Sequence, residues 1–431
     1  MSLKLRLIVM NFLQFFVWGS WLITIGVYWF QNKHWSGAQF GAIFSTMGIA
    51  SLFMPSIAGI IADKWINAER LYGVFHLLGV GMLFIIPTVG DPGTLFWVML
   101  VTMICYMPTI SLERVLSYNA IKEEGLDLVR DYPPIRVWGT IGFIAGTWTT
   151  SLLGFEASSG QFYVASASSL LLGIYAFTLP RCPPRLDRAH SKTLADSLGL
   201  TAFALFRSGK LAIFFIFAML LGAALQLTNA YGGTFLHDFD KIPEYKNLFA
   251  VQHSGIIISI SQISETLFIL AIPFFLKRFG IKTVMLISMI AWTLRFGMFA
   301  YGDPASIFGL SMIVLSCVVY GMAFDFFNIS GSLFVEGQCD PKIRASAQGL
   351  FMLMTNGIGA VLGSSISGLL IDRYFTAADG SKDWFHIWIT FAAYALVTAI
   401  AFAVLFKHKH DPQSFDVTHT HVPLGEELNQ P

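Results

Sequence analysis

Six ionisable side chains interrupt stretches of the chain that are otherwise apolar. A charge at the centre of a lipid bilayer costs about 2.5 to 3.5 kcal/mol on insertion scales, so each group needs a partner, a water-filled cavity or a function. The set balances three acids against three bases: Glu113, Arg114, Arg136, Glu265, Arg295 and Asp325. Such a balance is typical of a pathway whose walls carry mutually neutralising groups.

Polar and aromatic residues recur near those groups at spacings of three and four, which place them on one side of a helix. Amides that face lipid are penalised, so each stripe must face protein or water. The stripes are Arg136, Thr140 and Phe143; Gln226 and Asn229; Gln262 and Glu265; and Tyr320, Phe324 and Asp325, followed by Asn328. We expect them to line one cavity. Two other interpretations stay open. The amides can simply join membrane helices by hydrogen bonds, and the aromatic rings can simply pack between helices.

Two carboxyl groups in these stripes are the hardest to explain by packing. Glu265 and Asp325 would each be desolvated yet near a base, so a small rearrangement can change their protonation. Arg295 fits a fixed counter-ion better than a substrate ligand. Glu113 and Arg114 are adjacent in sequence, which directs them about 100° apart on a helix and argues against one simple pair.

The composition shows which solvent surrounds these stripes. Of 431 residues, 55% are apolar and 12% are charged, against roughly a quarter charged in a soluble domain. The mean hydropathy is +0.65. These values are typical of an integral membrane protein and exclude a soluble enzyme. The net charge of +1 argues against nucleic-acid binding, which needs a clear excess of basic residues.

Neither a metal nor a cofactor is expected. The four cysteines lie far apart without ligand spacing and are expected to pack: Cys105, Cys182, Cys317 and Cys339. Four tail histidines can be read as metal ligands, but a polar tail containing proline favours an unstructured segment: His408, His410, His419 and His421. The chain has no GxxxxGK[ST] loop and therefore no ATP-driven domain of that type.

Twelve apolar stretches are long enough to cross the ~30 Å hydrocarbon layer as helices. They cover residues 5–28, 38–62, 70–89, 94–118, 135–155, 162–180, 211–235, 252–276, 282–301, 307–331, 347–371 and 385–406. The longest polar connection follows the sixth. We therefore expect an amino-terminal six-helix bundle over 1–180, a cytoplasmic linker over 181–210, a carboxy-terminal six-helix bundle over 211–406 and a cytoplasmic tail over 407–431.

The basic residues of the loops predict the orientation. Loops on the side of the chain ends carry 19 lysines and arginines, and the opposite loops carry five. Cytoplasmic loops hold the excess of these residues, so both termini are expected in the cytoplasm.

Two pairs of matching motifs indicate an internal repeat. Residues 133–136 and 341–344 read PPIR and PKIR, 208 positions apart, and each precedes glycines spaced by four, Gly142 and Gly146 in one case and Gly359 and Gly363 in the other. The basic loops at 63–65 and 277–279 are offset by 214. Similar offsets near half the chain length predict two parallel halves with a site at their interface.

Longer motifs carry a family resemblance. They are NFLQFFVWGSWL, GIIADKW, DYPPIRVWGTIGF, LQLTNAYGGTFLHDF, SQISETLFILAIPFFLKRFGIK, RFGMFAYGDP, YGMAFDFFNISGSLFVE and IRASAQGLF. Together they resemble the bacterial nucleoside:proton symporters of the major facilitator superfamily, and within them the permeases for nucleosides and for xanthosine. The resemblance extends to about residue 410.

The resemblance implies an all-α integral membrane protein with the major facilitator fold: twelve transmembrane helices in two pseudo-symmetric six-helix bundles that alternate between inward- and outward-facing states. It implies import of purine and pyrimidine nucleosides with protons across a bacterial inner membrane, by a protein that we expect to be a monomer. The family's nucleoside pocket matches Arg136, Thr140, Phe143, Gln226, Asn229, Gln262, Glu265, Tyr320 and Phe324, and its proton-coupling acids match Glu265 and Asp325.

One segment departs from the family pattern. Relatives have small polar residues where this chain has Glu113 and Arg114, so this pair can alter the amino-terminal wall of the cavity. An oligosaccharide:proton symporter is the nearest alternative function. A polytopic membrane receptor or enzyme is the alternative from another class, but it needs a reactive cluster or a sizeable extramembrane domain, and the sequence shows neither.

Overall fold

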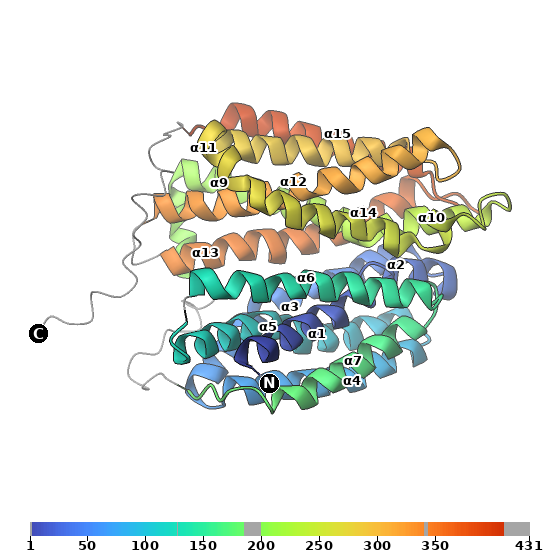
Figure 1. Ribbon diagram of the computed structural model, residues 1–431. Helices are drawn as coiled ribbons and strands as arrows, with labels where there is room; N and C mark the ends of the chain where they lie inside the picture. The colour runs from blue at the N-terminus through green and yellow to red at the C-terminus, as the bar shows by residue number, and fades with distance from the viewer. Residues whose placement is uncertain (1, 127, 185–199, 340–343, 409–431) are drawn as a thin grey trace, which may run out of the picture.

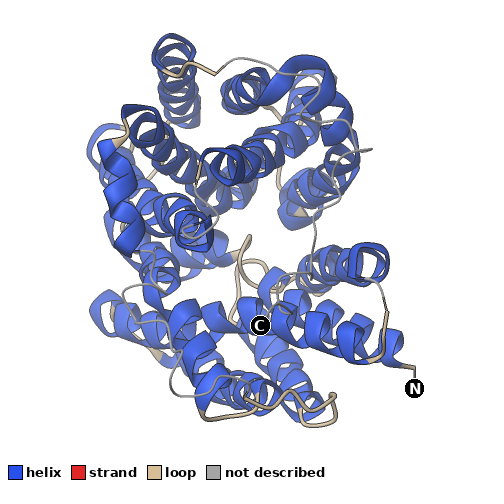
Figure 2. Ribbon diagram, turned by 90° about the vertical axis from the view of Figure 1, so that its left-hand side faces the viewer, coloured by secondary structure: helices blue, strands red, loops and turns tan. Residues whose placement is uncertain are grey.

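The computed structural model describes residues 2–126, 128–184, 200–339 and 344–408. These residues form helices and, apart from one isolated bridge between Thr376 and Lys382, no strand pairing. The first half of the chain lies together in the lower part of Figure 1 and the second half in the upper part. Figure 2 shows the helices nearly end-on.

The amino-terminal half contains α-helices and two short helical turns. Their bounds are α1 Leu3–Gly19, α2 Ile25–Val27, η1 Tyr28–Lys33, α3 Gly37–Lys64, α4 Ala68–Ile85, η2 Ile86–Thr88, α5 Pro92–Glu123, α6 Leu128–Leu152 and α7 Gly160–Ala176. The carboxy-terminal half has the same character. Its bounds are η4 Leu200–Arg207, α9 Gly209–Asp238, η5 Phe239–Lys241, α10 Phe249–Gln252, α11 Ser254–Ala300, α12 Ile307–Gln338, α13 Arg344–Met352, η6 Leu353–Gly359, α14 Ala360–Tyr374 and α15 Trp384–Leu405.

Eight of the described helical segments are long and apolar enough to cross a membrane. One of them, α11, has 47 residues, or about 70 Å at 1.5 Å per residue, more than twice the hydrocarbon thickness. Gly280 interrupts it with a φ of 75°, a conformation that costs a glycine little. The interruption falls between the predicted spans 252–276 and 282–301. Each of the twelve predicted spans overlaps a helical segment.

The helix expected over residues 5–28 is interrupted, because α1 ends at Gly19 and the chain turns before α2 begins at Ile25. Two backbone carbonyls at the break accept hydrogen bonds from side chains of α6. The Thr147 hydroxyl donates to the Gly19 carbonyl at 3.0 Å, and the Thr150 hydroxyl donates to the Ser20 carbonyl at 2.8 Å. Buried carbonyls need partners, and here a neighbouring helix supplies them.

Glycines set the closest helix contacts within each half. A side chain at Gly142 or Gly146 of α6 would collide with the backbone of α1, and one at Gly359 or Gly363 would collide with the backbone of α9. Helices in lipid associate by close packing of small residues, because lipid removes the hydrophobic drive between them. The two predicted glycine pairs therefore allow close packing in equivalent places of the two halves, between α6 and α1 in one and between η6 or α14 and α9 in the other.

The outside of the helices is apolar. Leu270, Phe274 and Val404 are 77%, 66% and 67% exposed, and a broad apolar exterior suits contact with lipid rather than water. All four cysteines are buried, as expected for packing residues.

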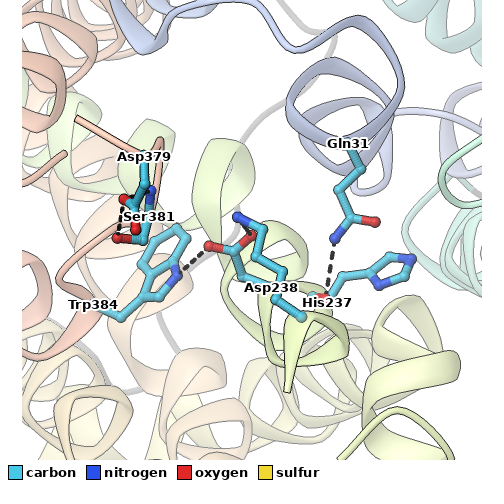
Figure 3. Close-up of polar contacts among 7 residues, drawn as sticks. Gln31, His237, Asp238, Asp379, Ser381 and Trp384 are labelled. Carbon is cyan, nitrogen blue, oxygen red and sulfur yellow. Dashed lines mark hydrogen bonds and ion pairs between the residues drawn. The ribbon is translucent and has the colours of Figure 1, made fainter. Parts of the chain in front are cut away.

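The end of the molecule that carries α2 and α10, on the right in Figure 1, is here called the far end. Several hydrogen bonds join the two halves there. Figure 3 shows part of it, where the Gln31 amide donates to the His237 carbonyl at 3.1 Å. Nearby, the Trp384 indole donates to Asp238 at 2.9 Å. The Lys382 ammonium lies 4.0 Å from the centre of the Phe30 ring, and burial lowers its pKa.

Candidate functional site

Arg136 lies on α6, two turns before the glycine seam with α1. Its guanidinium carbon is 4.3 Å from the centre of the Phe15 ring, a distance suited to a cation–π contact. A Cβ atom placed on Gly139 would lie 2.5 Å from Nη1 of Arg136. Phe15 and Gly139 therefore form a seat that holds the guanidinium against α1 and α6.

Two carboxyl groups of the other half interact with Arg136. Glu265 of α11 is partly buried, and Asp325 of α12 is only 6% exposed. The two carboxyls act on each other electrostatically, and the Arg136 charge acts on both. Oδ2 of Asp325 has no hydrogen-bond partner among the described residues. One predicted cation of the amino-terminal half thus lies within electrostatic range of two predicted acids of the carboxy-terminal half.

Tyr320 and Phe324 form an aromatic wall on α12. Their rings are nearly parallel, with an interplanar angle of 9° and centroids 6.3 Å apart. Trp292 of α11 packs edge-on against Tyr320 at 5.8 Å. Phe324 also lines a cavity, and its polar neighbours there are Asn328, Thr355 and Asn356.

Arg295 supports this aromatic wall from inside the carboxy-terminal half. It is fully buried and donates to the Thr228 hydroxyl at 2.8 Å, the Ser261 hydroxyl at 3.2 Å and the Ser316 carbonyl at 2.8 Å. Its guanidinium carbon lies 4.5 Å from the centre of the Tyr320 ring. These neighbours hold Arg295 in place and leave it facing Tyr320.

The predicted amides and the threonine lie on three helices, and two of these, α6 and α11, also carry charged groups of the site. Gln226 and Asn229 lie on α9, Gln262 on α11 and Thr140 on α6. Oε1 of Gln226 and Oε1 of Gln262 are buried and have no hydrogen-bond partner in the described part of the chain. Because orphaned buried amides are costly, these two fit a site that receives a polar ligand. Among the residues with described positions, no side-chain hydrogen bond joins these four to one another.

The amino-terminal half contributes a second aromatic group. Phe143 of α6 meets Trp18 edge-on at 6.4 Å, and Trp18 meets Tyr106 at 5.7 Å. Phe15 and Trp18 are not among the site residues predicted from the sequence. Their spacing of three on the face of α1 that also carries Asn11 and Gln14 could have shown them, since it repeats the stripe pattern seen elsewhere.

Glu113 and Arg114 separate as their adjacency predicted. Glu113 is fully buried and accepts a hydrogen bond from the Ser117 hydroxyl at 2.9 Å, whereas Arg114 is exposed. The Arg136 charge acts on Glu113 as well as on Glu265 and Asp325. Glu113 therefore interacts with the same cation as the two predicted acids, whereas Arg114 lies on the outer face of α5.

No group of histidine, cysteine and acidic residues suited to a metal occurs within the described ranges. His410, His419 and His421 lie outside those ranges, as do residues 185–199 of the predicted linker and most of the predicted tail. His408 contacts Lys210, whose Nζ is 3.2 Å from Nδ1.

Comparisons with known proteins identify the family of this chain. The profile of a family described as nucleoside H+ symporters matches residues 1–411. The chain is 55% identical over 422 residues to the xanthosine permease of Escherichia coli, covering 97% of this chain and all of that permease. It is 52% identical over 410 residues to the nucleoside permease NupG of Escherichia coli, covering 95% of this chain and 97% of NupG.

A crystal structure of the nucleoside transporter NupG has the same fold. It matches 95% of this chain and all of its own chain with a TM-score of 0.89 at 52% sequence identity. The helical arrangement described above is thus that of a transporter fold.

Proposed function

The chain belongs to the nucleoside H+ symporter family, and we propose how its two halves bind a nucleoside and couple its import to a proton. It is a multi-pass membrane transporter and not an enzyme. Proton-coupled nucleoside import is its activity, and the identity to permeases for nucleosides and xanthosine favours this function over oligosaccharide symport.

The proposed architecture is the major facilitator fold, with twelve transmembrane helices in two six-helix bundles over 1–180 and 211–406. The equivalent glycine contacts of α1 with α6 and of α9 with α14 support the repeat. The kink at Gly280 supports two spans within α11. The 19 basic residues on the side of the chain ends support an inner-membrane protein with both termini in the cytoplasm. The far end is then the extracellular end.

The nucleobase is proposed to lie between rings of the two halves. Phe143 offers a face from α6, and Tyr320 and Phe324 offer nearly parallel faces from α12. A flat base gains from stacking on aromatic side chains. Arg136, Thr140, Gln226, Asn229, Gln262 and Glu265 are proposed to bind the edges of the base and the ribose hydroxyls, because amides and a guanidinium supply the donors and acceptors that these groups need.

Proton coupling is proposed to use Glu265 and Asp325. Two interacting carboxylates repel, and taking up a proton at either relieves that repulsion and the cost of burying a second charge. When this pair of carboxyls carries one proton, the protein can pass through an occluded state more readily. Arg136 is proposed to neutralise the carboxylate that stays ionised, and Arg295 to act as a fixed counter-ion behind Tyr320.

The observation that carries this proposal is the convergence of Arg136 from α6 with Glu265 and Asp325 from α11 and α12. The test is uptake of radiolabelled uridine into proteoliposomes under an inward proton gradient, challenged with adenosine, guanosine, inosine, xanthosine and a disaccharide. We expect gradient-dependent uptake that nucleosides inhibit and the disaccharide does not. Inhibition by the disaccharide alone would support the oligosaccharide alternative instead.

A further inference from the structure

Two carboxylates at the far end each cross from one half of the protein to the start of a helix in the other. Asp372, near the end of α14, accepts hydrogen bonds from the backbone amides of Gly37 at 2.7 Å and Ala38 at 2.6 Å, at the start of α3. Glu156, between α6 and α7, accepts from the Ser254 hydroxyl at 2.5 Å and the Gly255 amide at 3.0 Å, at the start of α11.

The two contacts are related by the internal repeat. Glu156 and Asp372 are 216 residues apart, and their glycine partners Gly37 and Gly255 are 218 apart, close to the motif offsets of 208 and 214. In one contact the amino-terminal half supplies the carboxylate, and in the other it supplies the helix. The pair is therefore reciprocal, as a two-fold relation between halves requires.

Each contact is chemically suited to hold a carboxylate. The first amides of a helix have no partner within the helix, and they carry the positive end of its dipole. Bonds from such amides to an ionised acceptor are stronger than neutral ones. A Cβ atom on Gly37 would lie 2.6 Å from Oδ1 of Asp372, and one on Gly255 would lie 3.1 Å from Oε1 of Glu156, so both seats leave room for the oxygen only.

Further contacts surround the two carboxylates. One holds the Glu156 segment within its own half, and the others join the two halves nearby. The Gln161 amide donates to the Glu156 carbonyl at 3.0 Å. The Trp148 indole donates to Ser259 of α11 at 2.8 Å. The backbones of α3 and α14 approach closely where Gly41 and Gly368 meet. Separation of the halves at the far end must break both carboxylate contacts, because each joins residues of opposite halves.

We propose that Glu156 and Asp372 are paired gate residues for the transport cycle, which close the cavity on its extracellular side and set the balance between inward- and outward-facing states. The inference rests on the proposed function, since it assigns the far end to the outside. When the halves part, water replaces each carboxylate at the exposed helix start. No residue of the nucleoside pocket takes part in either contact.

The test is a distance measurement between spin labels on exposed loops of the two halves. Labels at positions 90 and 246, both exposed, are attached to introduced cysteines in a full-length background without the four native ones. We expect one dominant distance in the unaltered protein and a longer one in D372N, in E156Q and in the double variant. A loss of helix-terminus stabilisation at each contact raises the longer population about fivefold.

Asp91→Asn is the matched control, because Asp91 accepts from the Thr94 amide at 3.0 Å at the start of α5 within one half. This variant also loses a carboxylate that accepts from the first amides of a helix, but within one half. It should leave the distances between the spin labels unchanged. Gly37→Ser disrupts the Asp372 contact at its helix partner and should give the same longer distance. An unchanged distribution in the double variant and in Gly37→Ser would overturn the proposal.

The measurement uses neither a nucleoside nor a proton gradient. Failure of the proposed function would show as absent uridine uptake by the unaltered protein while the variant distances still lengthen. Failure of the gate proposal would show as normal uptake with distances that no variant changes.

Discussion

The Arg136 guanidinium rests on the Phe15 ring at 4.3 Å, and this contact joins α6 to α1 beside the carboxyl groups of the opposite half. The Arg136 charge acts on Glu113, Glu265 and Asp325. Its position therefore decides how the charge of the site is shared, and residues that hold it should matter although they carry no charge.

Replacing Phe15 by leucine should raise the apparent KM for uridine about 2- to 30-fold, the range of about 0.5 to 2 kcal/mol for a cation–π contact. Phe15→Tyr keeps the ring and should restore the unaltered value. Initial uptake rates over a range of uridine concentrations, in proteoliposomes, measure both. Equal KM values for leucine and tyrosine would show that the ring has no part in seating Arg136.

Gly139→Ala should also raise the KM for uridine, because the new methyl carbon falls 2.5 Å from Nη1 of Arg136 and displaces the guanidinium. Gly81→Ala is the matched control on α4, where a Cβ atom meets nothing within 4 Å. The same uptake assay compares the two. An unchanged KM in Gly139→Ala would contradict the position described for the Arg136 guanidinium.

Glu265→Gln and Asp325→Asn should abolish uphill accumulation of uridine while retaining exchange between internal and external uridine. Each substitution removes one of the two interacting carboxyls, so a proton taken up at the other no longer relieves a repulsion between them. Exchange at equal pH needs no net proton movement. Accumulation under an imposed pH gradient and counterflow without one separate the two activities. Uphill uptake by both variants would place proton coupling elsewhere.

Gln262→Ala and Asn229→Ala should each reduce uridine uptake below detection, because each removes an amide proposed to bind the substrate. The proteins should still insert and remain monodisperse in detergent, since neither side chain bonds to another described site residue. Gln252→Ala and Asn247→Ala are the controls, because both residues are exposed at the far end. Normal uptake by both site variants refutes the assignment.

The helices could be predicted from the sequence because long apolar runs and their glycine or charged borders are local features. The separation of Glu113 from Arg114 followed from helix geometry alone. The break after Gly19 could not be predicted, since the groups that satisfy its carbonyls, Thr147 and Thr150, are 128 and 130 residues away. The Asp372 contact spans 335 residues, and no local pattern marks its partner.

Aromatic residues of the site divide in the same way. Tyr320 and Phe324 stood out because an acid follows them on the same helix. Phe15 and Trp18 did not, because the chain has 40 phenylalanines and 11 tryptophans and most rings in membrane helices only pack. Their role emerges only once Arg136 is seen above one ring and Phe143 beside the other.

The break in α1 has a mechanical consequence. Thr147 and Thr150 tie the helix of Arg136 to the unwound carbonyls, and a few residues later Gly26 abuts the backbone of α9 at Ala230. These contacts form one continuous path from the helix of Arg136, through the break after Gly19, to a helix of the opposite half.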